Sequence, residues 1–180
     1  MRSTVVVFAL IAAICPSAGI AQGHAHTPGM SHDSAMAVNR LRVTRDSLGA
    51  LAVADSALAA ITRGDVIALT DLMLPEAVLF PSGTRDGKSG YSVRTRAEQR
   101  ASPLTGITER GFRAEVRVSG PVAVVWYPYD LYVKNVWSHC GADVFVMFQA
   151  EGRWRISSLS WSAVQPPACE KHPDGPPATR

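Results

Sequence analysis

The chain has 180 residues, of which 47% are hydrophobic and 18% are charged, with 18 Lys and Arg residues against 15 Asp and Glu residues. This composition is typical of a globular domain rather than a disordered or fibrous chain. The small positive excess is scattered along the sequence, so no nucleic-acid partner is expected. Beyond residue 21, no apolar stretch is long enough to cross a membrane.

Residues 1–21 have the pattern of a secretory signal peptide. Arg2 supplies a positive start, residues 5–14 form an uncharged apolar run, and Gly19 and Ala21 are the small residues that a signal peptidase recognises. The apolar run is much shorter than the roughly 20 residues that a membrane-spanning helix needs. The sequence therefore predicts export, cleavage after Ala21, and a periplasmic or secreted protein with no membrane partner after cleavage.

Residues 22–43 are expected to form a flexible linker that contains His and Met residues. If cleavage follows Ala21, His24 becomes the third residue of the mature chain. The terminal amine, two backbone amides and this imidazole would form a square-planar nitrogen set suited to copper(II) or nickel(II). His26 and His32 are further candidate metal ligands. Two interpretations stay open: the linker binds a metal, or it only separates the domain from the export machinery.

One domain is predicted over residues 44–164, and it begins with two helices. Apolar residues recur there at spacings of three and four, which is the pattern of an amphipathic helix. These residues are Leu48, Leu51, Ala54, Leu58 and Ile61. Gly64 suits the left-handed residue that ends a helix, and Asp65 suits the N-cap of a second, shorter helix.

The rest of the domain is predicted to be mostly strands. Residues 77–80 and 91–94 are expected to be two short strands around an Asp-Gly turn region. Thr95 and Glu98 form a capping-box pattern, which predicts a short helix over residues 96–101. Four longer strands are expected in segments rich in Val, Trp, Tyr and Phe. These segments are residues 113–118, 122–133, 136–149 and 154–163.

This order of helices and strands predicts an α+β fold in one domain. A strongly curved antiparallel sheet would wrap around the N-terminal helices as a cone and leave an open-ended cavity. The proline-rich residues 165–180 cannot continue regular structure and are expected to form an irregular tail.

Cys140 and Cys169 both lie in the predicted mature chain. An oxidising compartment and an even number of cysteines favour one disulfide, which would fix the tail over the sheet. The alternative is a buried free thiol at Cys140 and an exposed free thiol at Cys169.

Three segments resemble a bacterial subgroup of the nuclear transport factor two-like superfamily that is often labelled SnoaL-like or lumazine-binding-like. They are residues 122–130 (VAVVWYPYD), 138–143 (SHCGAD) and 152–156 (GRWRI), and residues 63–65 (RGD) and 74–78 (LPEAV) also fit. The resemblance extends from about Asp46 to Ala163. The superfamily includes ketosteroid isomerases, polyketide cyclases and scytalone dehydratases, so the resemblance implies a fold and not an activity. It also implies a homodimer, because members often pair through the sheet.

Asp130 and His139 are the candidate catalytic residues. Lys134 and Asn135 predict a two-residue turn, and such a turn sets the register of the hairpin that it closes. The predicted pairs on one face of the sheet are Asp130 with His139, Tyr132 with Trp137, and Trp126 with Asp143. A slip of one residue would move every one of these side chains to the other face.

The leading hypothesis is that the conical pocket binds a small apolar or aromatic ligand, with no cofactor. The candidate ligand-binding residues are Trp126, Tyr132, Trp137, Asp143 and Trp154. The alternative is a cofactor-independent isomerase, cyclase or dehydratase in which Asp130 orients His139 as a general base. The same pair also fits a structural role, as a buried His satisfied by a carboxylate. The sequence leaves open whether the protein is an enzyme.

Overall fold

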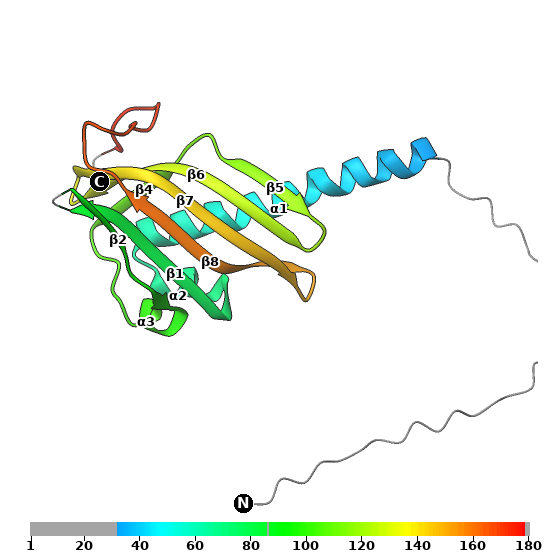
Figure 1. Ribbon diagram of the computed structural model, residues 1–180, viewed down its shortest axis with the longest axis horizontal. Coiled ribbons are helices and arrows are strands. Elements are labelled where there is room, and N and C mark those ends of the chain that lie inside the picture. Colours follow the sequence, from blue (N-terminus) through cyan, green and yellow to red (C-terminus); the bar gives the residue numbers. More distant parts are fainter. Residues whose placement is uncertain (1–31, 86, 179–180) are drawn as a thin grey trace, which may run out of the picture.

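The computed structural model describes residues 32–85 and 87–178, and it contains three helices and one eight-stranded sheet (Figure 1). The helices are α1 (His32–Arg63), α2 (Val66–Asp71) and α3 (Arg96–Arg100). The strands are β1 (Met73–Arg85), β2 (Lys88–Tyr91), β3 (Arg94–Thr95), β4 (Ile107–Gly111), β5 (Glu115–Ser119), β6 (Val122–Val133), β7 (Val136–Ala150) and β8 (Arg153–Ala163). The predicted α+β fold class is confirmed. No helix among the described residues has both the length and the hydropathy to span a bilayer.

Helix α1 begins at His32, earlier than the predicted start near Thr44. The C-terminal part of the predicted linker therefore belongs to the helix, whose first half projects beyond the sheet (Figure 1). Leu41, in this half, is 72% exposed. The apolar periodicity missed these residues because they have no buried face, although Ala, Met, Leu and Arg all favour helix.

The predicted helix ends are confirmed. Gly64 has a φ of 72° at the end of α1, and an added Cβ there would press on the carbonyl oxygen of Leu104. The Asp65 carboxylate accepts a hydrogen bond from the Ala68 N–H at 2.9 Å as the N-cap of α2. Thr95 and Glu98 form the predicted capping box of α3. These local signals place the three helices because each satisfies backbone groups that would otherwise lack partners.

The sheet has the order β2-β1-β8-β7-β6-β4, with β3 beside β1 and β5 beside β6. All neighbours are antiparallel except β1 and β8, which run parallel, so the sheet is mixed rather than wholly antiparallel. Strand β4 was not predicted, and β1 is much longer than the short strand expected there. Strand β4 contains Thr, Glu, Arg and Gly and has no apolar run, so its pairing with β6 is what makes it a strand.

The hydrophobic core lies between α1 and the concave face of the sheet. Alanines 50, 54, 57 and 60 of α1 are fully buried and let the helix approach the strands closely. They belong to one cluster with Val125, Phe145, Met147 and Ile156 from β6, β7 and β8. Trp154 belongs to the same cluster, and its ring packs against Gly49 of α1. A cavity remains next to this packing, beside α2 and α3.

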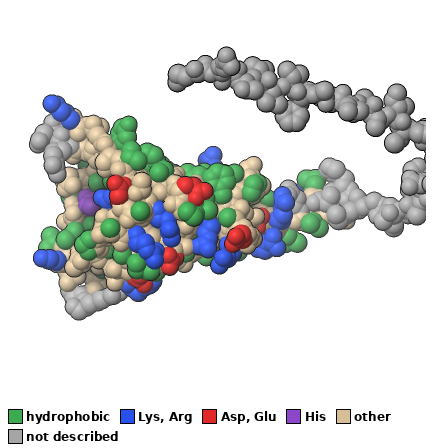
Figure 2. All heavy atoms as spheres, turned by 90° about the horizontal axis from the view of Figure 1, so that it is seen from below, with side chains coloured by type: hydrophobic (Ala, Val, Ile, Leu, Met, Phe, Trp, Pro, Cys, Tyr) green, Lys and Arg blue, Asp and Glu red, His purple; other side chains and the backbone are tan. Residues whose placement is uncertain are grey.

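On the face of the molecule drawn in Figure 2, charged side chains of both signs are present. Figure 2 shows Lys and Arg interspersed with Asp, Glu and apolar side chains on one face of the molecule. Arg96 and Arg100 of α3, for example, both pair with Asp71 at the end of α2. The scattered charge expected from the sequence is therefore also scattered in space on this face.

The hairpin of β6 and β7 has the predicted turn but not the predicted register. Lys134 and Asn135 have φ values of 50° and 65°, as a two-residue turn of this kind requires. Tyr132 lies opposite Trp137 as predicted. A bulge between Leu131 and Tyr132 then shifts the pairing by one residue for the rest of the hairpin. Bulges insert an extra residue into one strand, and no feature of the sequence marked this one.

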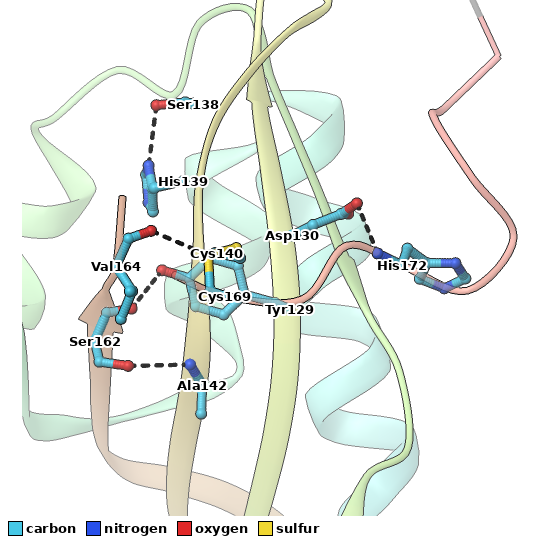
Figure 3. The surroundings of a disulfide bond; sticks show 10 residues. All are labelled: Tyr129, Asp130, Ser138, His139, Cys140, Ala142, Ser162, Val164, Cys169 and His172. Atoms are coloured by element: carbon cyan, nitrogen blue, oxygen red, sulfur yellow. Dashed lines mark hydrogen bonds between the residues drawn. A yellow bond between two sulfur atoms is a disulfide. The ribbon is translucent and has the colours of Figure 1, made fainter. Parts of the chain in front are cut away.

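The C-terminal tail covers part of the convex face and is held there by the predicted disulfide. Cys140 of β7 is bonded to Cys169, with their Cα atoms 5.9 Å apart (Figure 3). Val164 also exchanges two backbone hydrogen bonds with Cys140, at 2.7 and 3.1 Å. The disulfide prediction is confirmed, and the free-thiol alternative is wrong.

Beneath the tail, Asp130 forms a buried ion pair with Arg110. Its two carboxylate oxygens accept hydrogen bonds from Arg110 Nε and Nη2 at 3.0 and 2.6 Å. One of them also accepts the His172 backbone N–H of the tail at 3.0 Å. The Asp130 side chain is fully buried, whereas that of Arg110 is 20% exposed. This carboxylate therefore joins β4, β6 and the tail.

Asp130→Ala should lower the free energy of unfolding by about 2–4 kcal/mol, because it leaves the partly buried Arg110 without its counter-ion. Urea denaturation followed by circular dichroism measures the loss. Glu170→Ala is the control, since it breaks the exposed Arg113–Glu170 pair and should cost less than about 1 kcal/mol. Equal losses in the two variants would contradict a structural role for Asp130.

Candidate functional site

The concave face of the sheet encloses a cavity of about 340 Å³ near α2 and α3. Helices α1 and α2 contribute Ile61 and Leu69, and β8 contributes Leu159 and Trp161. The volume is at the lower end of the range for small-molecule sites, which are mostly apolar with a few polar groups. The polar side chains on the wall are Arg94, Gln99, Glu109, Tyr129, His139 and Asp143.

Glu109 reaches the cavity from β4 and is 8% exposed. The hydroxyl of Thr62, on α1, donates to the Glu109 carbonyl at 2.9 Å and accepts the Glu109 N–H at 3.0 Å. This double contact satisfies the backbone of Glu109 and fixes where its side chain starts. Burial raises the pKa of the Glu109 carboxyl to about 8.

Asp143 reaches the same cavity from β7 and is 3% exposed. Its Oδ2 atom is buried and has no hydrogen-bond partner in the described part of the chain. Burial raises the pKa of this carboxyl well above its usual range, and the charge of Glu109 raises it further. The two acids are therefore close enough to influence each other, and both favour the protonated form near neutral pH.

Tyr129 and His139 complete the polar part of the wall. The Tyr129 hydroxyl donates to the Ser162 carbonyl at 2.9 Å, and burial followed by the charges of Asp143 and Glu109 raises its pKa. His139 Nδ1 lies 3.0 Å from the Ser138 hydroxyl, and burial lowers the pKa of the imidazole. Both groups are thus neutral near pH 7, so this end of the cavity offers hydrogen bonds rather than fixed charge.

The predicted catalytic pair does not exist, because Asp130 and His139 lie on opposite faces of the sheet (Figure 3). After the bulge, His139 faces Leu131 and Asp130 faces Cys140. Facing residues share a side of the sheet, and consecutive residues alternate sides. His139 therefore points into the cavity, whereas Asp130 points to the tail. Neither the catalytic nor the structural version of the pair holds.

The same shift separates the predicted ligand-binding residues. Asp143 lines the cavity as expected, but its cross-strand neighbour is Tyr127. Trp126 faces Val144 on the convex side, where it is 49% exposed.

The other three aromatic candidates also lie away from the cavity wall. The Arg110 guanidinium lies 5.5 Å from the centroid of the Tyr132 ring. The Lys171 ammonium lies 4.1 Å from the centroid of the Trp137 ring. Trp154 belongs to the hydrophobic core. These three rings therefore pack within the structure, and their place in the binding site is not supported by the geometry.

The predicted metal ligands are not tested by the structure. His24 and His26 lie outside the described residues, and His32 is the first residue of α1, with its side chain also outside the description. Within residues 32–85 and 87–178, no group of three His, Cys, Asp or Glu side chains is placed to hold a metal ion. Metal binding by the N-terminal segment stays a prediction.

Sequence reasoning missed Glu109, Tyr129, Arg94 and Gln99. Glu109 and Arg94 belong to short polar segments that are indistinguishable in sequence from surface strands or loops. Tyr129 lies next to Asp130 in β6 and therefore points to the opposite face, into the cavity. The pairing of Glu109 with Leu131 could not be anticipated, since only the sheet brings these positions together.

Comparison with known proteins identifies the fold. No family model and no curated protein matches the sequence. A protein of unknown function with a cystatin-like fold from Nostoc punctiforme is similar in structure, with a TM-score of 0.55 and 12% identity over 69% of this chain and 93% of that chain. An NTF2-like protein from Cytophaga hutchinsonii has a TM-score of 0.51 and 19% identity over 67% and 98%. A ketosteroid isomerase-like protein from Erwinia carotovora atroseptica has a TM-score of 0.51 and 17% identity over 67% and 98%.

The chain therefore has the nuclear transport factor two-like fold, as the sequence resemblance implied. At these identities the similarity concerns the fold alone, so the function depends on the residues in this chain's own cavity.

The raised pKa of Glu109 predicts a pH-dependent stability. From its ordinary value of 4.5 to about 8, the folded chain holds a proton that the unfolded chain releases. Stability should therefore fall as the pH rises through this window, by at most about 1.4 kcal/mol per pH unit for one proton. Glu109→Gln should remove this contribution. As the pH rises, the unfolding free energy of the variant should therefore increase relative to that of the wild type.

Urea denaturation at a series of pH values measures this difference. Glu115→Gln is the matched control, because the Glu115 side chain is exposed on β5 and stays in water in both states. Its profile should run parallel to that of the wild type. If the Glu109→Gln profile also ran parallel to that of the wild type, burial in the cavity would not raise the pKa of the Glu109 carboxyl.

Proposed function

We propose that the cavity binds a small, largely apolar or aromatic molecule whose carbonyl or hydroxyl group is held by Asp143. The observation that carries the proposal is that Asp143 lines the cavity while its buried Oδ2 atom has no hydrogen-bond partner among the described residues. A buried polar atom left unpaired costs about 1–3 kcal/mol, and a bound ligand would recover that cost. Leu69, Leu159 and Trp161 supply the apolar wall for the rest of the ligand.

A second candidate function is cofactor-independent proton transfer on the same ligand. It is favoured by two carboxyl groups, Glu109 and Asp143, whose pKa values are both raised in an apolar cavity. At a pH high enough to ionise one member of such a pair, that member can take a proton from a carbon next to a carbonyl, while the protonated member donates a hydrogen bond to the carbonyl oxygen. This pair replaces His139 and Asp130 as the basis for an isomerase, cyclase or dehydratase.

Export to the periplasm or the exterior is also part of the proposal. The Cys140–Cys169 disulfide supports it, since such bonds persist in oxidising compartments. Residues 1–21 lie outside the described part, and the mass of the mature chain would check cleavage after Ala21. Pairing of two copies remains a proposal that rests on the fold resemblance.

Ligand binding can be measured with the neutral fluorophore N-phenyl-1-naphthylamine. We expect its fluorescence to rise on binding, and 2-acetylnaphthalene to displace it more effectively than 2-ethylnaphthalene, which lacks the carbonyl. Asp143→Leu keeps the size of the side chain and removes the hydrogen bond. In this variant, the ratio of the affinities for the ketone and for 2-ethylnaphthalene should fall by about fivefold, which corresponds to the loss of one neutral hydrogen bond.

The location of the fluorophore is tested by two tryptophan substitutions. Val133 lines the cavity and is 39% exposed, so Val133→Trp should narrow the opening and weaken binding. Ile67 on α2 is exposed and does not line the cavity, so Ile67→Trp should leave binding unchanged. Binding that is insensitive to Val133→Trp, or a ketone preference that survives Asp143→Leu, would refute the proposed site.

Proton transfer predicts deuterium exchange at the methyl group of 2-acetylnaphthalene in heavy water. The wild type should accelerate this exchange, as followed by nuclear magnetic resonance. Glu109→Gln and Asp143→Leu should each lower the rate by about 100-fold, because general acid–base groups typically contribute that much or more. Binding without accelerated exchange would leave the ligand-binding function and remove the catalytic one.

A further inference from the structure

Arg94 brings a guanidinium group to the cavity wall. It lies on the short strand β3, directly across from Leu79 of β1. Facing residues share one side of a sheet, so Arg94 and Leu79 both belong to the concave face. Leu79 is 1% exposed and lines the same cavity. The guanidinium thus lies beside apolar residues of the concave face. Strand β3 is near one edge of the sheet, and β4, which carries Glu109, forms the opposite edge.

The partner that orients this guanidinium is neutral. Arg94 Nη1 donates to the Gln99 side-chain oxygen at 2.7 Å. Gln99 is 3% exposed and also lines the cavity, so its amide is a fixed acceptor. A neutral amide positions the guanidinium without cancelling its charge.

Nearby carboxylates do not neutralise Arg94 by contact. None of the ion pairs between described residues includes Arg94. Glu98 is the acid whose pKa is influenced by the Arg94 charge, but two hydrogen bonds from Thr95 lower that pKa more. Glu98 is exposed to water. Its carboxylate accepts hydrogen bonds from the Thr95 N–H and hydroxyl at 2.7 and 2.8 Å, as part of the capping box.

An anion in the cavity would meet favourable conditions. Guanidinium presents a rigid fork of donors that matches a planar carboxylate, and its attraction is stronger next to apolar surface than in water. The acids of the opposite wall favour their protonated forms near neutral pH, so they would not repel the anion strongly.

We propose that Arg94 binds a carboxylate or a similar planar anionic group of the ligand. The ligand class is then a small aromatic or apolar molecule with an anionic group held at Arg94 and a hydrogen-bonding group held at Asp143. This inference rests on the proposed ligand-binding function of the cavity. It adds the charge of the ligand and the residue that selects it.

The test compares two competitors that share one aromatic body, 2-naphthoate and its neutral methyl ester. Each displaces N-phenyl-1-naphthylamine from the full mature chain at neutral pH. The wild type should bind 2-naphthoate about tenfold more tightly than the ester, as expected for one charge-assisted interaction. Arg94→Gln should abolish this preference by weakening the binding of 2-naphthoate and not that of the ester. Arg94→Lys should retain part of the preference.

Arg117→Gln is the matched control, because Arg117 is exposed on β5, opposite Val124 on the convex side. It should keep the preference of the wild type. A second measurement needs no variant: added salt should weaken binding of 2-naphthoate and leave binding of the ester unchanged.

The outcomes separate the two proposals. An unchanged preference in Arg94→Gln, equal weakening of both competitors, or salt-independent binding of 2-naphthoate would each overturn the role of Arg94. Failure of both the fluorophore and the ester to bind the wild type would instead overturn the ligand-binding function of the cavity.

Discussion

The one-residue bulge between Leu131 and Tyr132 determines which side chains β6 and β7 present to each side of the sheet. Side chains alternate along a strand, so the shift exchanges the two faces of β6 relative to β7 beyond that point. It turns His139 and Asp143 into the cavity together with Tyr129, and it turns Asp130 to the opposite side. The bulge thereby places Tyr129, His139 and Asp143 on one wall of the cavity and leaves Asp130 on the opposite face, where it pairs with Arg110 of β4.

The close approach of β8 supports this arrangement. Gly141 has no side chain, and a Cβ there would collide with the backbone of Ser162. The gap is used by polar contacts: Ser162 accepts a hydrogen bond from Tyr129 through its carbonyl and one from the Ala142 N–H through its hydroxyl, at 2.9 and 3.1 Å. These contacts join β6 and β7 to β8. The hydrogen bond to Ser162 therefore fixes the position of the Tyr129 ring on the cavity wall.

Much of the fold could be predicted from local patterns. The spacing of apolar residues in α1, the caps at Gly64 and Asp65, and the capping box of Thr95 each depend on residues within one or two turns of helix. The turn at Lys134 and Asn135 is likewise a property of two residues, and the pairing of cysteines followed from their number and the expected compartment. The early start of α1 was missed because an exposed helix has no apolar face to detect.

The site was decided by tertiary structure. Glu109 is an acid with a raised pKa only because β4 pairs with β6 and Thr62 of α1 covers its backbone. Arg94 reaches the cavity through the pairing of β3 with β1, which no local pattern specifies. The sequence by itself determined the helices, the turn, the disulfide and the fold class, because these depend on neighbouring residues or on composition. Only the tertiary structure decided which polar side chains share the cavity, because burial and facing arise from contacts between strands far apart in the chain.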